Sequence, residues 1–205
     1  HNALDLDSVV ENFIDTIAAV IGSEGEISAR MKTILKPCLY TLAKYPETTL
    51  YDLLAFISES EPDHAPWVDR ARRTLTNRSQ LDTLESFFDK HYATTKNAVR
   101  DRLRALLSSD ALDRCLTSEN TVDLETLMNQ GKVIVFNLSA GTMGSATSAG
   151  FGRFVLCAVQ NAAMRRQSVA AHQRKSVFLF MDEADRFMSE AVISVYKETR
   201  KYGLH

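Results

Sequence analysis

Apolar residues recur at three- and four-residue spacing from the N-terminus to Gln130, which is the pattern of amphipathic helices. The first stripe consists of Val9, Val10, Phe13, Ile14, Ile17, Val20 and Ile21. It predicts a helix that ends near Gly22. The same spacing continues over 27–42, where Pro37 removes one backbone donor and predicts a bend in a long second helix.

Helix-start and helix-stop residues mark further elements before the pattern changes. Thr49-x-x-Asp52 resembles a capping box and predicts the start of a third helix. The acidic stretch 58–63 predicts a loop. Asp123 is expected to cap a short helix over 124–129 that Gly131 ends in the left-handed conformation. Between these elements the spacing predicts helices over 67–75, 81–88, 99–107 and 112–116.

The hydrophobic period changes after Gly131. Residues 132–138 are β-branched and almost wholly apolar, as expected of a strand buried on both faces of a parallel sheet. Residues 176–181 predict a second strand of the same kind, followed by a helix from about Ala184 to Lys201. A helix with Phe154 to Ala162 lies between them, so the order implies a right-handed crossover in a parallel sheet.

We therefore expect a mainly α chain with an α/β portion. A multi-helix, all-α domain is expected over 1–130, and a partial parallel-sheet segment over 131–205. Two strands are too few for a stable sheet, so the remaining strands must come from other sequence. The Gly- and Ser-rich segment 139–152 contains no lysine, which favours a mobile surface loop over a phosphate-binding nest.

Composition narrows the class of protein only slightly. With 205 residues and 45% hydrophobic content, the chain can bury a sizeable core. The net charge of -2 gives no whole-chain reason to expect a nucleic-acid partner. Three cysteines without C-x-x-C spacing, Cys38, Cys115 and Cys157, argue against a zinc site and fit a reducing cytosol. No apolar run is long enough to cross a bilayer, so no membrane contact is expected from this segment.

Two adjacent carboxylates follow the second expected strand. Val177-Phe-Leu-Phe-Met181 runs directly into Asp182-Glu183, and ligands of open α/β sheets bind beyond the carboxyl ends of the strands. In P-loop NTPases one carboxylate of such a pair holds Mg²⁺ and the other activates the attacking water. Asp182 is therefore expected to hold Mg²⁺ through a water molecule, and Glu183 to activate the attacking water. The alternative is that Asp182 only caps the following helix. No G-x-x-x-x-G-K-[ST] occurs, so the phosphate-cradling loop is missing.

A second cluster, Arg200-Lys-Tyr-Gly203, follows after about one helix length. A strand ending in Asp-Glu, a helix and this cluster resemble the HerA/FtsK-type ATPases, in particular the TraG/TraD-like coupling proteins of conjugative type IV secretion. The resemblance implies an all-α domain, here Asn2–Gln130, inserted between the phosphate-binding loop (Walker A) and the Asp-Glu strand (Walker B). It implies that 131–205 belong to a RecA-like P-loop NTPase core.

The resemblance also implies roles for individual residues. Asp182 becomes the metal-associated residue and Glu183 the catalytic carboxylate. Arg200 becomes a candidate arginine finger that acts in trans on a neighbour's γ-phosphate, because its planar fork can contact two phosphoryl oxygens. The alternative for Arg200 and Lys201 is a favourable basic pair at a helix C-terminus.

The function that this resemblance implies belongs to a larger protein. It is a homo-hexameric motor ATPase that uses ATP and Mg²⁺ to move DNA or a relaxase-type nucleoprotein in conjugation. The helical domain would recognise the substrate or secretion-system accessory proteins, and the fragment alone would be inactive without a Walker A loop. We expect a cytoplasmic location, including the cytoplasmic face of a membrane through other parts of the parent protein.

Two other functions stay open. Asp182-Glu-Ala-Asp185 spells the second motif of DEAD-box RNA helicases, but Ser145-Ala-Thr147 lies upstream of it, whereas that family carries Ser-Ala-Thr downstream. The chain would then be an RNA helicase fragment. The other alternative is a non-catalytic helical adaptor domain whose Asp-Glu pair performs no chemistry.

Arginines gather on two of the expected helices and are candidate contacts for phosphate or an acidic partner. They are Arg70, Arg72, Arg73 and Arg78 in one group, and Arg100, Arg102 and Arg104 in the other. Asp69, Asp82, Glu85 and Asp101 lie nearby in the sequence, so both groups are equally typical of solvated, charge-balanced helix faces. The basic pairs at 165–166 and 174–175 are likewise either contacts for phosphate or an acidic partner, or solvated surface charges.

Overall fold

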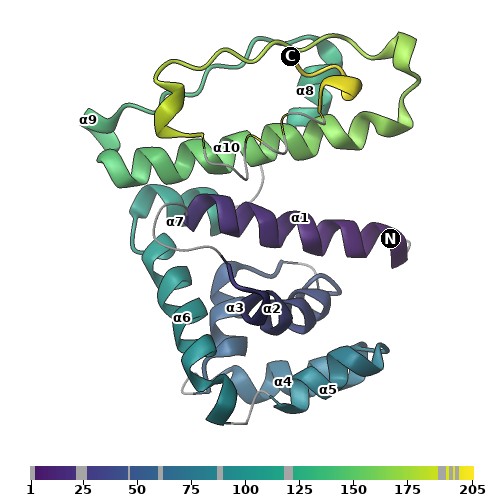
Figure 1. Ribbon diagram of the computed structural model, residues 1–205, viewed down its shortest axis with the longest axis vertical. Coiled ribbons are helices and arrows are strands. Elements are labelled where there is room, and N and C mark those ends of the chain that lie inside the picture. The colour runs from purple at the N-terminus through teal and green to yellow at the C-terminus, as the bar shows by residue number, and fades with distance from the viewer. Residues whose placement is uncertain are drawn as a thin grey trace. The chain divides into compact units, whose positions relative to one another are not determined.

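The computed structural model describes residues 3–21, 27–45, 47–59, 62–86, 90–117, 122–188, 193, 196 and 199–205. Over these residues the chain is mainly helical, as the sequence predicts. It divides into two compact units, His1–Ile14 with Glu26–Ser118 and Asp15–Gly25 with Glu119–His205. We call them the helical unit and the second unit, and both appear in Figure 1.

No helix within the described ranges has the length and apolar character that a bilayer crossing requires.

The helical unit is built around α2, which packs against α3, α4, α5 and α6. Its helices are α1 (Ala3–Ile21, which continues into the second unit), α2 (Ala29–Leu42), α3 (Leu50–Ile57), α4 (His64–Thr74), α5 (Arg78–Ser86), α6 (Lys90–Leu107) and α7 (Asp110–Thr117). The fully buried side chains of Ile34, Leu35 and Phe56 lie in its core. The predicted helix end near Gly22 and the predicted Phe87 and Phe88 lie outside the described residues.

Local sequence signals explain several helix ends. The predicted capping box is confirmed, because Asp52 Oδ2 accepts a hydrogen bond from the Thr49 N–H at 2.8 Å and Thr49 Oγ1 accepts one from the Tyr51 N–H at 3.2 Å. Asp123 Oδ1 likewise accepts from the Thr126 N–H at 3.1 Å. Gly131 ends that helix with a φ of 71°, in the left-handed conformation that the sequence predicts.

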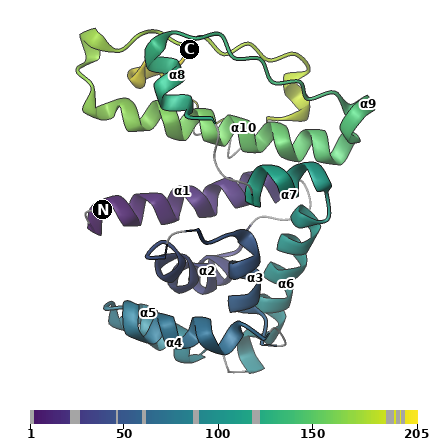
Figure 2. The ribbon, with the colours of Figure 1, turned by 180° about the vertical axis from the view of Figure 1, so that it is seen from behind.

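The second unit is organised along the long helix α10. Its helices are α8 (Leu124–Gln130), α9 (Ala140–Met143) and α10 (Ser145–Arg165). Short 3₁₀ turns follow at Arg166–Ser168, Ala171–Gln173, Ala184–Arg186 and Arg200–Tyr202. Figures 1 and 2 show two extended segments of the chain, 132–138 and 176–181, running along α10.

The prediction of a surface loop over 139–152 is wrong. These residues form α9 and the first turns of α10, where Gly150 and Gly152 are buried. A Cβ at Gly152 would lie 2.3 Å from Phe187 Cδ1, so the small residue admits an aromatic ring onto the helix. Small side chains here allow close packing rather than a mobile loop.

The expected parallel pairing of two strands, 132–138 with 176–181, is not found in the described part of the chain. Instead, Val177 forms an isolated parallel bridge with Leu204. The N–H groups of Val177 and Leu179 donate to the carbonyls of Gly203 and His205, both at 2.8 Å, and the His205 N–H donates to Val177 O at 2.9 Å. In the described residues, β-pairing of 176–181 is therefore limited to the single parallel bridge between Val177 and Leu204.

Each extended segment turns one face toward α10 and leaves the other open. Val177, Leu179 and Leu204 pack with Val155 and Val159 of α10 in one apolar cluster. A second cluster joins Leu156, Cys157 and Phe187 with Leu138 and Met181. The alternate positions are exposed: Val133 by 92%, Val135 by 85%, Phe178 by 65% and Phe180 by 90%. Residues 176–181 therefore have the alternation of a half-covered strand, whereas in 132–138 Phe136 is also exposed, by 37%, and Leu138 packs on α10.

Candidate functional site

The Asp182-Glu183 pair lies directly after the second extended segment, and both side chains are exposed. Leu179 and Met181, which precede the pair, pack toward α10 and fix where the segment ends. Asp182 Oδ1 accepts a hydrogen bond from the Glu183 N–H at 3.0 Å. A helix cap would accept instead from the second or third residue of the helix. In this conformation Asp182 therefore does not act as a helix cap.

Glu183 adopts an uncommon backbone conformation. Its φ of 50° and ψ of 44° are left-handed, which costs a residue with a Cβ about 1–2 kcal/mol. Such strain is concentrated at functional sites in proteins, because the surrounding structure must maintain it. The Glu183 carboxylate forms an ion pair with Nη1 of Arg186, one turn further along the chain. Glu183 is thus presented to solvent with a cation beside it.

Phe187 anchors on α10 the loop that contains Asp182 and Glu183. Its ring is 6% exposed and packs against Leu156 and Cys157, in the space that Gly152 leaves. The buried Ser148 Oγ donates a hydrogen bond to Leu138 O at 2.5 Å, which holds the end of the other extended segment. Both segments therefore end beside the N-terminal half of α10.

Sequence reasoning did not predict these anchoring roles of Ser148, Gly152 and Phe187. The available signal was a glycine inside a helical pattern, which often indicates close packing. The partner of that glycine lies far along the chain, so the sequence pattern does not identify it.

The carboxylates offer oxygen ligands but do not form a metal centre by themselves. Within the described ranges, no three or more His, Cys, Asp or Glu side chains are arranged to hold a metal ion. Magnesium is bound in nucleotide sites by one or two carboxylates together with phosphates and water. The chemistry of Asp182 and Glu183 therefore fits a magnesium–nucleotide complex better than a metal held by protein alone.

Arg200 is exposed in the 3₁₀ turn Arg200–Tyr202. Gly203 ends this turn with a φ of 82°, and the Gly203 N–H donates to Arg200 O at 3.0 Å. Thr199 and Leu204, on either side of the turn, are buried and hold it in place. Within the part of the chain that the structure describes, the Arg200 guanidinium has no hydrogen bond or ion pair.

Arg200 and the carboxylate pair lie at opposite ends of the parallel bridge. Gly203 is level with Val177, and Asp182 lies about 16 Å further along the extended segment. Arg200 precedes Gly203, on the far side of the bridge. The structure therefore does not bring Arg200 and Glu183 together within one chain.

The arginines of the helical unit do not form one common site. Arg72 pairs with Glu85 at 3.0 Å and Asp69 at 3.6 Å, and its hydrogen bond to Glu85 raises the Arg72 pKa. Arg100 pairs with Asp101 at 3.2 Å. These pairings match the charge-balanced alternative.

The other candidate arginines of this unit are dispersed. The Arg70 guanidinium lies over the rings of Trp67, at 4.4 Å from the centroid, and Tyr45, at 5.4 Å. Arg73 is exposed in the last turn of α4, and Arg104 is exposed in the last turn of α6. The seven candidate arginines therefore lie on three helices, α4, α5 and α6, in different local settings.

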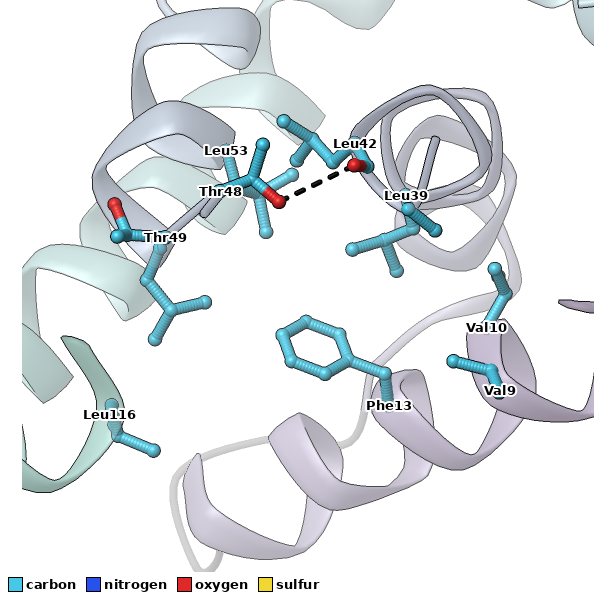
Figure 3. A pocket seen from close by; sticks show the side chains of 11 residues that line it. Val9, Val10, Phe13, Leu39, Leu42, Thr48, Thr49, Leu53 and Leu116 are labelled. Carbon is cyan, nitrogen blue, oxygen red and sulfur yellow. Dashed lines mark hydrogen bonds between the residues drawn. The ribbon is translucent and has the colours of Figure 1, made fainter. Parts of the chain in front are cut away.

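The helical unit also contains an apolar cavity of about 180 Å³ between α1, α2 and α3. Figure 3 shows the ring of Phe13 pointing into it, with Leu39 and Leu53 on neighbouring walls. The Thr48 hydroxyl at its edge already donates to Leu42 O and Tyr45 O, each at 3.3 Å. This cavity is therefore apolar, whereas the candidate catalytic carboxylates, Asp182 and Glu183, lie at the end of an extended segment of the second unit.

Comparisons of the chain with protein-family models, with curated proteins and with solved structures found no match. Its function is therefore inferred from its own residues and their geometry.

Proposed function

We propose that the chain is a segment of a ring-forming motor ATPase of the HerA/FtsK type, which moves DNA or a relaxase-type nucleoprotein in conjugative type IV secretion. Residues 131–205 belong to its RecA-like core, and the helical unit recognises the substrate or an accessory protein. ATP and Mg²⁺ are its cofactors. The ring is a homo-hexamer, located in the cytoplasm or at the cytoplasmic face of a membrane.

One observation carries this proposal. Asp182-Glu183 follows the extended segment whose Val177 and Leu179 bond in parallel to Gly203–His205. Parallel neighbours require a long crossover connection, and α/β enzymes place their ligands beyond the carboxyl end of such strands. The position of the carboxylate pair after such a segment supports the proposal of nucleotide chemistry there.

The exposed apolar face of the extended segments supports the same conclusion. Val133, Val135, Phe178 and Phe180 are large apolar side chains that are each exposed. Parallel sheets are covered on both faces, and exposed apolar patches mark surfaces that contact other protein. In this proposal, further helices and strands of the ATPase core cover that face.

The chain's own residues divide the chemistry between two subunits. When bound, Mg²⁺-ATP would supply the transferable phosphoryl group, and its Mg²⁺ would neutralise negative charge that develops during transfer. Asp182 would hold the metal through water, and Glu183 would accept a proton from the attacking water once its ion pair with Arg186 opens. Arg200, at the opposite end of the parallel bridge, contacts the phosphates held by the neighbouring subunit.

Subunit mixing tests this arrangement in the longer protein that carries the phosphate-binding loop. Glu183→Gln and Arg200→Ala subunits are each expected to be inactive as pure rings. In a random mixture, about one quarter of the interfaces combine an intact Glu183 with an intact neighbouring Arg200, so that fraction of the ATPase activity returns. No recovery in rings shown to be mixed would exclude the in-trans role of Arg200. Absence of a G-x-x-x-x-G-K-[ST] loop upstream would favour the adaptor alternative.

A further inference from the structure

Six cationic side chains gather at the end of the second unit opposite the carboxylate pair. We call this surface the basic end: Arg165, Arg166, Arg174, Lys175, Arg200 and Lys201. The members are brought together by the parallel bridge, since Lys175 O and both Nη atoms of Arg166 lie within 4 Å of a Cβ built on Gly203. They come from three parts of the chain, so the sequence pairs alone do not predict the cluster.

Arg174 holds the basic end in a fixed shape. Its guanidinium donates to three backbone carbonyls, those of Val169 and Lys201 at 2.8 Å and that of Gln167 at 3.1 Å. It also lies over the Tyr202 ring, 5.6 Å from the centroid, and Lys201 Nζ is 5.1 Å from the same centroid. The exposed cations therefore lie on a loop and a 3₁₀ turn that the hydrogen bonds of Arg174 hold together.

Arg166 places a buried positive charge beneath this surface. The residue has an exposed fraction of 0%, and it donates from Nη2 to Lys175 O. Its Nε and Nη1 have no hydrogen-bond partner in the described structure. Burial and then the charge of Arg174 lower the Arg166 pKa. The charge of Glu125 opposes this shift, but two nitrogens of the buried guanidinium are without hydrogen bonds to the described residues, which is unfavourable and would be relieved by a further anion nearby.

Among the described residues, most cations of the basic end have no carboxylate partner, whereas the helical unit contains both paired and unpaired cations. In the helical unit, Arg72, Arg100, Lys36 and Lys96 all have carboxylate partners. At the basic end, only Arg165 has one within the described ranges, Glu125 at 3.3 Å. The whole-chain net charge of -2 therefore conceals a locally positive surface.

We propose that the basic end, through its cations other than Arg200, binds the sugar-phosphate backbone of a nucleic acid. Phosphate contacts require unpaired Lys and Arg side chains and no particular base sequence. Protein interfaces instead are depleted in Lys and need apolar anchors. The exposed large apolar side chains of the described residues all lie outside 165–175 and 200–203, so a nucleic acid is favoured over an acidic protein.

This inference rests on the charge distribution and not on the proposed ATPase chemistry. Lys175 and Lys201 have no role in that chemistry, so variants at these positions separate the two proposals. Both side chains are exposed, and the Lys175 ammonium makes only a 3.3 Å hydrogen bond to Gln130 O. Their replacement is not expected to disturb folding, which circular dichroism checks.

The test is a fluorescence-anisotropy titration of labelled single-stranded and duplex DNA with the 205-residue chain, without nucleotide, at several salt concentrations. The double variant Lys175→Glu/Lys201→Glu is expected to weaken DNA binding at least about tenfold. It should also reduce the slope of log K against log salt by about 1.4 for single strands, which corresponds to two lost phosphate contacts.

Lys44→Glu/Arg114→Glu is the matched control, because it makes the same change in net charge on exposed cations of the helical unit that are not among the candidate phosphate contacts. It is expected to retain most of the affinity. The proposal is overturned if DNA does not bind, or if both double variants lose affinity equally. It is also overturned if polyglutamate competes as well as DNA, which identifies an acidic protein, or if tripolyphosphate does, which identifies a nucleotide.

Discussion

Single side chains in this protein acquire their properties from a few close neighbours. Asp123 shows this simply, because the hydroxyl and the N–H of Thr126 both bond to its carboxylate, at 2.6 and 3.1 Å. These bonds favour the charged form and lower the Asp123 pKa. Glu183 differs in that its backbone is left-handed and that Phe187, four residues further along the chain, is buried against α10.

We expect the stability contribution of Asp123 to depend on pH. A carboxylate whose pKa is lower in the folded state stabilises the fold above the unfolded pKa, near 3.8, and loses this effect as the pH falls through the folded value. Asp123→Asn keeps a capping oxygen but cannot titrate. Urea unfolding midpoints of the two proteins should therefore differ more at pH 7 than at pH 3. A difference that is the same at both pH values would contradict this account.

Helices and extended segments differ in how far the sequence could predict them. The caps at Thr49 and Asp123 and the helix end at Gly131 have their partners within four residues, so local patterns located them. The pairing of Val177 with Leu204 depends on backbone groups far apart in the chain, and periodicity does not choose between such partners. The same limit explains why 139–152 was predicted as a loop, since the ring that packs on Gly152 belongs to Phe187.

The sequence predicts the position of the carboxylate pair but not the side chains that hold its loop in place. A strand pattern that ends in Asp182-Glu183 is continuous along the chain and could be recognised directly. The hydrogen bond from Ser148 to Leu138 and the packing of Phe187 become visible only when α10 lies beside the extended segments. Arg200 could be named from its motif, but its distance from Glu183 follows from the parallel bridge.

Gly152→Ala should test the contact that positions the carboxylate loop. The added Cβ would lie 2.3 Å from Phe187 Cδ1, so we expect a loss of about 1–3 kcal/mol in the free energy of unfolding, the usual range for overpacking. Chemical denaturation measures the change.

Two controls make this measurement specific. Gly141→Ala adds the same methyl group in α9, where the Cβ would lie 3.7 Å from Ser139 Oγ, an ordinary contact distance, and should not destabilise the protein. In a Phe187→Ala background, the cost of Gly152→Ala should largely disappear, because the clashing ring is gone. An unchanged cost in that background would show that Phe187 is not the cause.

Considered as a whole, the chain combines a self-contained helical unit with a second unit whose apolar face is open. The core of the helical unit buries Ile34, Leu35 and Phe56 completely. The second unit buries one face of its extended segments on α10 and exposes Val133 and Phe180 by 90% or more. This asymmetry agrees with the proposal that other protein covers the exposed face.

Val133→Asp/Phe180→Asp tests that part of the proposal. In the 205-residue chain these side chains are exposed, so the change in stability should stay within about 0.5 kcal/mol per site. In the longer protein, where the core is expected to cover them, the buried charges should lower the melting temperature clearly. Equal melting-temperature changes in the two proteins would contradict a covered face.

The most direct test of the central claim measures ATP hydrolysis by the longer protein with Glu183→Gln. The account predicts a loss of roughly 10²–10⁴-fold in turnover, the usual contribution of a positioned acid or base, with ATP binding retained. Asp185→Asn is the matched control, because Asp185 is an exposed carboxylate on the same loop, and it should leave turnover close to that of the unmodified protein. Unchanged hydrolysis by the Glu183→Gln protein would contradict the assignment of Asp182-Glu183 as the catalytic pair.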